Sequence, residues 1–193
     1  MNNASTTSEK ILQCAQALLV AGGYNGFSYA DIGKVIGIRN ASIHHHFASK
    51  AVLVQTLVRQ YREAAQDGVA AMERNITDPL AQLRAYAGYW ESCMTQPEAA
   101  FCVCAMLAAE LPMLPQEIAM EVKAHFRFFA LWLESVLERG QRQGSLRLTD
   151  APRVEAERFL ATIHGAMLSA RAYDDPKMFG IIVHPMLERL VMA

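Results

Sequence analysis

The sequence lacks several features that would place it in a familiar class at once. It has no run of about 18 uncharged apolar residues, so we expect no membrane-spanning segment. Its first ten residues, MNNASTTSEK, have neither the basic flank nor the apolar stretch of a secretion signal. Four cysteines in 193 residues are too few and too unevenly spread for a disulfide framework. These absences predict a cytoplasmic protein with reduced thiols.

Motifs of catalysis and of metal or cofactor binding are also missing. The chain contains no His-x-x-x-His, Glu-x-x-His, Cys-x-x-Cys or Gly-x-Ser-x-Gly, and no phosphate-cradling glycine loop. The spacing of the histidines therefore argues against a helical metal-dependent hydrolase that would use them. We therefore expect no enzymatic activity, no metal ion and no cofactor.

Strand patterns are missing too, because no stretch alternates apolar and polar residues between turn residues. Apolar residues instead recur at intervals of three and four, which predicts an all-α protein. No proline occurs before Pro79, whereas later prolines separate the helical segments. The predicted helices cover residues 8–21, 28–35, 39–46, 49–75, 79–95, 99–110, 115–142, 152–173 and 176–191.

The front of the chain differs from the rest in charge and in its turns. Residues 1–50 hold four Lys or Arg against two acidic residues, a net +2, so the remainder carries −3 of the total −1. Ser28 and Asp31 have the spacing of a helix-capping box, and Gly37 suits a tight turn before the next short helix. This pattern indicates a helix-turn-helix, although a plain helical hairpin would also fit the spacing.

The short helix after that turn reads RNASIHHHF over residues 39–47. Ile43 and Phe47, four residues apart, would face the core, so the polar side chains would face outward. Consecutive helical residues are about 100° apart, so the three histidines cannot grip one metal ion. A pH sensor is conceivable but not required. An outward set of amide, imidazole and guanidinium groups is typical of a face that contacts bases and phosphates.

Residues 23–54, GYNGFSYADIGKVIGIRNASIHHHFASKAVLV, carry a family resemblance. This run resembles the DNA-binding head of TetR/AcrR-type transcriptional regulators. The resemblance implies an N-terminal helix-turn-helix head of three helices, a helical ligand-binding and dimerisation domain, and about nine helices in all. We accordingly predict a DNA-binding domain over residues 1–50 and a ligand-sensing and dimerisation domain over residues 51–193.

The resemblance also assigns candidate contacts to double-stranded operator DNA. Two departures from the family's usual residues are Arg39, where Ser or Thr is common, and His44, where Tyr is common. Helix ends would meet phosphates, and the third helix would enter the major groove. The candidate DNA-binding residues are Ser28, Tyr29, Arg39, Asn40, Ala41, Ser42, His44, His45 and Lys50.

The remainder of such a regulator would bind a small apolar or amphipathic effector that releases a near-palindromic operator. Large adaptable side chains and a few polar groups in apolar stretches are the candidates, although each is individually more typical of ordinary packing. Apolar stripes on the last two helices would form a homodimer. The candidate effector-binding residues are Tyr86, Tyr89, Trp90, Met94, Cys102, Met106, Glu110, His125, Phe126, Phe129, Trp132, His164 and Met167.

Cys102 supports a further hypothesis, because it lies at the start of a predicted helix, where the helix dipole would lower a thiol pKa. Oxidants or electrophiles would then be the signal; buried, inert thiols are the simpler interpretation. The alternative for the whole chain is a helical ligand-binding or thiol-sensing module with weakened DNA readout, which only the Arg39 and His44 departures favour.

Overall fold

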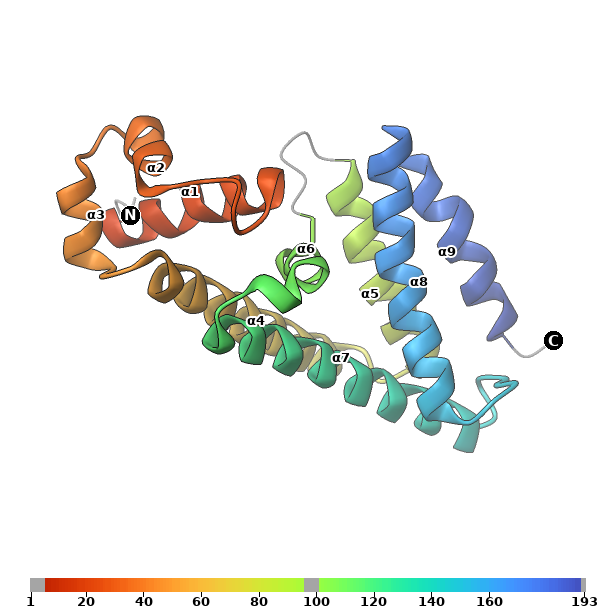
Figure 1. Cartoon of the computed structure of the whole chain (residues 1–193). Coiled ribbons are helices and arrows are strands. Elements are labelled where there is room, and N and C mark those ends of the chain that lie inside the picture. The colour runs from red at the N-terminus through yellow and green to blue at the C-terminus, as the bar shows by residue number, and fades with distance from the viewer. Residues whose placement is uncertain (1–5, 96–100, 192–193) are drawn as a thin grey trace. The chain divides into compact units, whose positions relative to one another are not determined.

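The computed structural model describes residues 6–95 and 101–191, and in these ranges the chain forms nine α-helices, one 3-10 helix and no strand (Figure 1). A single isolated bridge joins Leu146 and Val191. The predicted all-α fold is therefore confirmed. The helices are α1 (Thr7–Gly22), α2 (Tyr29–Ile36), α3 (Asn40–His46), α4 (Lys50–Asn75), α5 (Pro79–Met94), α6 (Val103–Ala109), the 3-10 helix η1 (Leu111–Met113), α7 (Gln116–Arg142), α8 (Pro152–Tyr173) and α9 (Lys177–Arg189).

Local capping chemistry explains where the first helices begin and end. Ser28 caps α2 in a capping box, as the sequence predicts. Gly37 ends α2 in the left-handed conformation, with φ 73°, which is why a glycine stands there. The helix predicted for residues 99–110 begins only at Val103, and residues 96–100 lie outside the described part of the chain.

The chain divides into two compact units. The first comprises residues 1–64 and 102–125, and thus α1, α2, α3, most of α4, α6, η1 and the start of α7. Helix α1 packs on α2 and α6, and α2 packs on α3. Its core is mainly apolar, which is the main stabilising contribution, and His125 is a buried polar residue within it. Fully buried side chains of this core include Ile11, Leu19, Ile32, Ile43, Leu53, Leu107 and Ile118.

The second unit comprises residues 65–101 and 126–193. Helices α8 and α9 form its most extensive packing, and α5 packs on both of them (Figure 1). Aromatic rings fill the space between α5, α7 and α8. Tyr86 lies 5.3 Å from both Phe129 and Trp132, and 6.4 Å from Phe159, measured between ring centroids.

The two units do not coincide with the predicted boundary near residue 50, because α6 and the start of α7 belong to the first unit. The division into residues 1–50 and 51–193 separates the DNA-binding role from the ligand-sensing and dimerisation roles. It does not describe compact units, and it stays a prediction.

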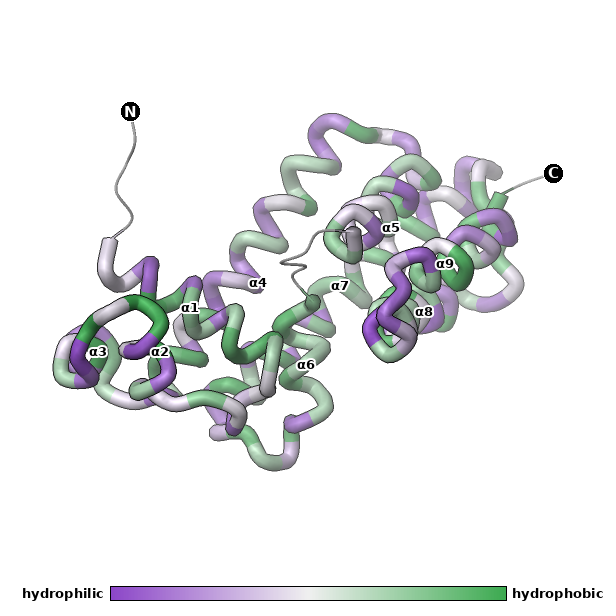
Figure 2. The backbone as a smooth tube through the Cα atoms, turned by 90° about the horizontal axis from the view of Figure 1, so that it is seen from above, coloured by the Kyte–Doolittle hydropathy of each residue, from purple (hydrophilic) through white to green (hydrophobic). Residues whose placement is uncertain are grey.

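Hydrophobic and hydrophilic positions are mixed along each helix, as expected for helices that bury one face (Figure 2). Among the described residues, no helix combines the length and the apolar character needed to cross a membrane.

Candidate nucleic-acid interface and effector site

Helix α3 exposes the side chains that the sequence assigned to DNA. Ile43 is fully buried and Phe47 nearly so, and they fix the helix on the core of the first unit. The outward surface carries no acidic side chain, which suits an approach to phosphates. The exposed residues are Arg39, Asn40, Ala41, His44, His45 and His46, whereas Ser42 is half-buried.

Tyr29 holds α3 in place from inside the first unit. It is buried, and its hydroxyl donates a hydrogen bond of 2.9 Å to the carbonyl oxygen of Phe47, just after α3. Its ring and the His44 ring pack in an edge-to-face arrangement, with 4.8 Å between their centroids. Burial raises the pKa of Tyr29 to about 12. Because its hydroxyl hydrogen is already donated, Tyr29 orients α3 here, and its phosphate contact stays a prediction.

Ser28 lies at the exposed N-terminus of α2 and is hydrogen-bonded to Asp31. The Ser28 hydroxyl donates to the Asp31 carboxylate at 2.6 Å, and the Ser28 backbone N–H donates to the same carboxylate at 2.8 Å. These hydrogen bonds hold the pKa of Asp31 below its usual range. The cap keeps the start of α2 helical, because the Ser28 hydroxyl oxygen accepts from the Asp31 backbone N–H.

Lys50 is tied to the turn that precedes α2. Its ammonium donates to the carbonyl oxygen of Phe27 and lies 4.2 Å from the centroid of the Phe27 ring and 4.7 Å from that of Tyr24. Burial lowers the pKa of Lys50, while the carboxylates of Glu110 and Asp31 act in the opposite sense. Lys50 therefore joins the start of α4 to the turn before α2, in addition to its predicted phosphate contact.

Two residues of α2 were not among the candidates predicted from the sequence. A Cβ atom at Gly33 would lie 2.7 Å from the carbonyl oxygen of Ile38, so only glycine permits the close turn between α2 and α3. The signal was a glycine inside a helical pattern, which usually marks a close backbone approach. Val35 of α2 is 65% exposed, and it is an apolar group of the kind that can contact a thymine methyl.

The candidate effector residues fall into two groups, one in each unit. In the first unit, Cys102 and His125 are buried, with the thiol sulfur 3.9 Å from His125 Nε2. The His125 ring lies 5.5 Å from that of Tyr61. Met106 is half-buried on the same short helix, α6.

The expected low pKa of Cys102 is wrong. Cys102 does precede α6 as its N-cap residue, but it is fully buried, and burial raises the pKa of its thiol. Backbone hydrogen bonds act in the opposite sense without prevailing. Removal of the thiolate from water outweighs the dipole of a seven-residue helix.

Glu110 contacts the backbone of the first unit. Its carboxylate oxygens accept hydrogen bonds of 3.0 and 3.2 Å from the backbone N–H of Tyr24, in the turn between α1 and α2. Gly23 has φ 75°, and a Cβ atom there would lie only 2.0 Å from Glu110 Oε1. This carboxylate thus satisfies a turn donor and has fewer free positions to offer an effector.

The second group is an aromatic cluster in the second unit. Most of its members are buried between α5, α7 and α8, whereas Tyr89 is 57% exposed and therefore peripheral. Buried members are Tyr86, Trp90, Phe129, Trp132 and Met167, and half-buried members are Met94, Phe126 and His164.

The polar atoms of this cluster are uncharged. The Trp132 indole donates to Glu73 Oε1 at 3.1 Å, whereas the Trp90 Nε1–H is buried with no acceptor among the described residues. His164 packs on Phe126 at 5.1 Å between ring centroids, and burial lowers its pKa to about 4, so the ring is neutral at neutral pH. A buried N–H without an acceptor costs about 1–3 kcal/mol.

Comparisons with known proteins agree with this fold. Residues 11–57 match the family described as bacterial regulatory proteins, tetR family, and residues 79–184 match the Tetracyclin repressor-like, C-terminal domain. The chain belongs to the TetR family of transcriptional regulators. It is a repressor-like DNA-binding regulator, and regulators of this family act by binding operators as dimers, without catalysis.

Solved structures and one curated relative are similar over most of their length. A TetR-family transcriptional regulator from Agrobacterium tumefaciens is 59% identical, with TM-score 0.93, over 96% of this chain and 97% of that one. A TetR transcriptional regulator from Legionella pneumophila is 26% identical, with TM-score 0.87, over 97% and 99%. The HTH-type transcriptional repressor DhaR of Mycobacterium sp. (strain GP1) is 23% identical over 149 residues, 76% of this chain and 73% of that protein.

Proposed function

We propose that this chain is a cytoplasmic repressor that binds a near-palindromic operator as a homodimer and leaves it when a small effector binds. The observation that carries the proposal is the outward face of α3. It is free of acidic groups, and it presents Asn40, Ala41 and His44 while Ile43 anchors the helix from behind. An amide can read adenine, a small residue permits close approach, and imidazoles donate to bases or phosphates.

A second copy is the proposed partner of α8 and α9. These helices keep large apolar side chains in solvent although they pack closely on each other. Leu168 and Tyr173 near the end of α8, and Ile181 near the start of α9, are 54%, 71% and 61% exposed. Small exposed residues on α8, Ala161 and Gly165, would let a partner helix approach closely. A two-fold four-helix bundle would bury this face.

The aromatic cluster of the second unit is the proposed effector site. Its walls are apolar, His164 is neutral there, and the Trp90 N–H has no acceptor among the described residues. An apolar or amphipathic molecule with one hydrogen-bond acceptor would satisfy that donor. Binding would favour a form of the dimer that does not fit the operator, which is a population shift.

Selection of DNA from a random pool with the purified protein tests the proposal, followed by a salt titration on the selected sequence. We expect a near-palindrome with two half-sites and a linear fall of log affinity with log salt. Weak binding without sequence enrichment would favour the alternative, a helical ligand-binding module with weakened DNA readout.

Single substitutions then test the assigned face. Asn40→Ala and His44→Ala should each weaken operator binding by about tenfold or more with the fold intact, because each removes a base or backbone contact. His46→Ala is the matched control, since it removes an exposed imidazole that projects to the side of the same helix. Unchanged affinity in the first two variants would mean that another face meets the DNA.

A further inference from the structure

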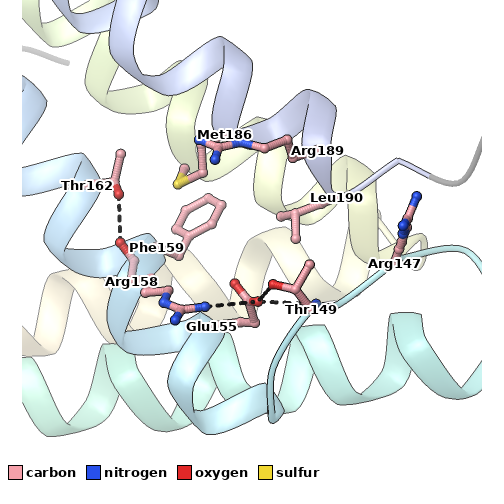
Figure 3. Close-up of a pocket in the computed structure, with 9 residues that line it drawn as sticks. All are labelled: Arg147, Thr149, Glu155, Arg158, Phe159, Thr162, Met186, Arg189 and Leu190. Atoms are coloured by element: carbon pink, nitrogen blue, oxygen red, sulfur yellow. Dashed lines mark hydrogen bonds and ion pairs between the residues drawn. The ribbon is translucent and has the colours of Figure 1, made fainter.

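A hollow of about 320 Å³ lies between α8 and α9, at the end where α8 begins and α9 ends (Figure 3). It belongs wholly to the second unit. None of the residues proposed for the effector site lines it, although its wall residue Phe159 lies 6.4 Å from Tyr86 of that site, between ring centroids. Its volume is at the lower end of the range for small-molecule sites. Apolar side chains from both helices, Phe159, Met186 and Leu190, form one part of its wall.

Three arginines line the same hollow and differ in their partners. Arg158 is already paired, with the Asp150 carboxylate and, at 3.5 Å, with Glu155. Arg147 and Arg189 have no carboxylate within 4.0 Å among the described residues. Arg189 Nε makes one contact, of 3.4 Å, to a carbonyl oxygen of its own helix.

The two carboxylates near the hollow have little capacity left to neutralise more arginines. Glu155 Oε1 accepts from the Thr149 hydroxyl at 2.7 Å and from the backbone N–H groups of Thr149 and Asp150 at 3.3 and 3.2 Å. Three guanidinium groups against two carboxylates leave one positive charge. Guanidinium groups match carboxylates in planar, two-point hydrogen bonding.

We infer that this hollow binds a small organic monoanion, a carboxylate with an apolar body, beside Arg189. The carboxylate pairs with the Arg189 guanidinium, which lies beside Met186 in Figure 3, and the body covers Phe159, Met186 and Leu190. Arg147, on the opposite side of the hollow in this view, adds a second positive charge at longer range. Arg158 stays with Asp150 and Glu155, and these two acidic groups disfavour a dianion. The loop that carries Arg147 is already joined to the end of α9, since its backbone N–H donates to the carbonyl oxygen of Leu190 at 2.9 Å.

Calorimetric titration of the full-length protein tests the inference, with acetate, hexanoate, benzoate and 4-phenylbutyrate as probes. We expect 4-phenylbutyrate to bind and its uncharged amide to bind at least about tenfold more weakly, because the amide forms no charged pair with arginine. The double variant Arg147→Gln/Arg189→Gln should lose a similar factor. Arg153→Gln is the matched control: it removes an exposed arginine of α8 that lies outside the hollow and is paired with Glu134 and Glu157.

Helical circular dichroism and operator binding, measured on every variant without a probe, separate loss of the site from loss of the fold or of the proposed function. Equal affinities for 4-phenylbutyrate and its amide would overturn the inference. So would equal affinities of the double variant and Arg153→Gln, or no binding of any of the four carboxylates at about 10 mM, a very weak affinity. Tighter binding of phenyl phosphate than of the carboxylates would overturn the monoanion assignment.

Discussion

Gly23 and Glu110 meet in the turn between α1 and α2, and their contact predicts a specific non-additivity in stability. Replacing Gly23 by Ala would place a Cβ atom 2.0 Å from Glu110 Oε1 and would hold a non-glycine residue at φ 75° and ψ −175°. The carboxylate end of Glu110 is flexible, so we expect it to move away. Its hydrogen bonds to the Tyr24 N–H would then break.

The magnitude follows from these two effects. A non-glycine residue in that region of backbone space costs about 2 kcal/mol. Loss of a hydrogen bond to a charged group costs about 1.5 kcal/mol when solvent can partly replace it, as at the half-buried Tyr24. Gly23→Ala should therefore destabilise by about 3.5 kcal/mol, and Glu110→Ala by about 1.5 kcal/mol. The double variant should also lose about 3.5 kcal/mol, because the bond is lost only once.

Urea unfolding followed by circular dichroism measures this cycle. All variants need the same protein concentration, because the stability of a dimer depends on it. Gly37→Ala is the matched control: Gly37 also has a positive φ, 73°, but a Cβ atom there would meet no side chain or distant backbone within 4 Å. Its effect should add to that of Glu110→Ala. If the effects of Gly23→Ala and Glu110→Ala also add, to about 5 kcal/mol, the proposed displacement of the carboxylate is refuted.

Three further predictions concern the second unit and the thiols. The folded state keeps His164 neutral, with a pKa of about 4 against an ordinary 6.5, so stability is complete above pH 6.5 and should fall by roughly 3 kcal/mol towards pH 4. In the His164→Phe variant, the free energy of unfolding, measured with urea at several pH values, should no longer show this fall between pH 6.5 and pH 4. Iodoacetamide should modify the half-buried Cys93 while Cys102 stays unmodified by mass spectrometry, and rapid native modification of Cys102 would revive the thiol-sensor hypothesis. Leu168→Glu or Ile181→Glu should shift the protein from dimer to monomer in sedimentation, because either buries a charge in the proposed interface.

The head of the chain was predictable because its signals are local. The capping box of Ser28 and Asp31 depends only on residues three apart, so it can be predicted from the sequence. The positive φ of Gly37 depends only on the local turn, so it can be predicted in the same way. The spacing of Ile43 and Phe47 then decides which side of α3 faces solvent. The outward set on α3 followed from the same periodicity.

Burial is a different matter, because it depends on what packs from elsewhere in the chain. Cys102 was correctly placed at a helix start, yet the direction of its pKa was wrong because helices distant in sequence remove it from water. Tyr29 is a similar case: its position in the family pattern suggested phosphate, while its hydroxyl is donated to Phe47, 18 residues away. Periodicity reveals which face is buried and leaves open which partner buries it.

Both the burial and the partner of Glu110 depend on residues distant in the sequence, and this affects how its role can be tested. As a polar residue ending an apolar stretch it was a reasonable effector contact, but its carboxylate accepts from Tyr24, 86 residues earlier, beside the ammonium of Lys50. A variant of Glu110 that no longer responds to an effector would therefore be ambiguous. Gly23→Ala separates the two explanations, because it displaces the carboxylate from the turn without removing it from the protein. Equal loss of response in both variants would assign the effect to the contact with the turn; loss in Glu110→Ala alone would assign it to effector binding.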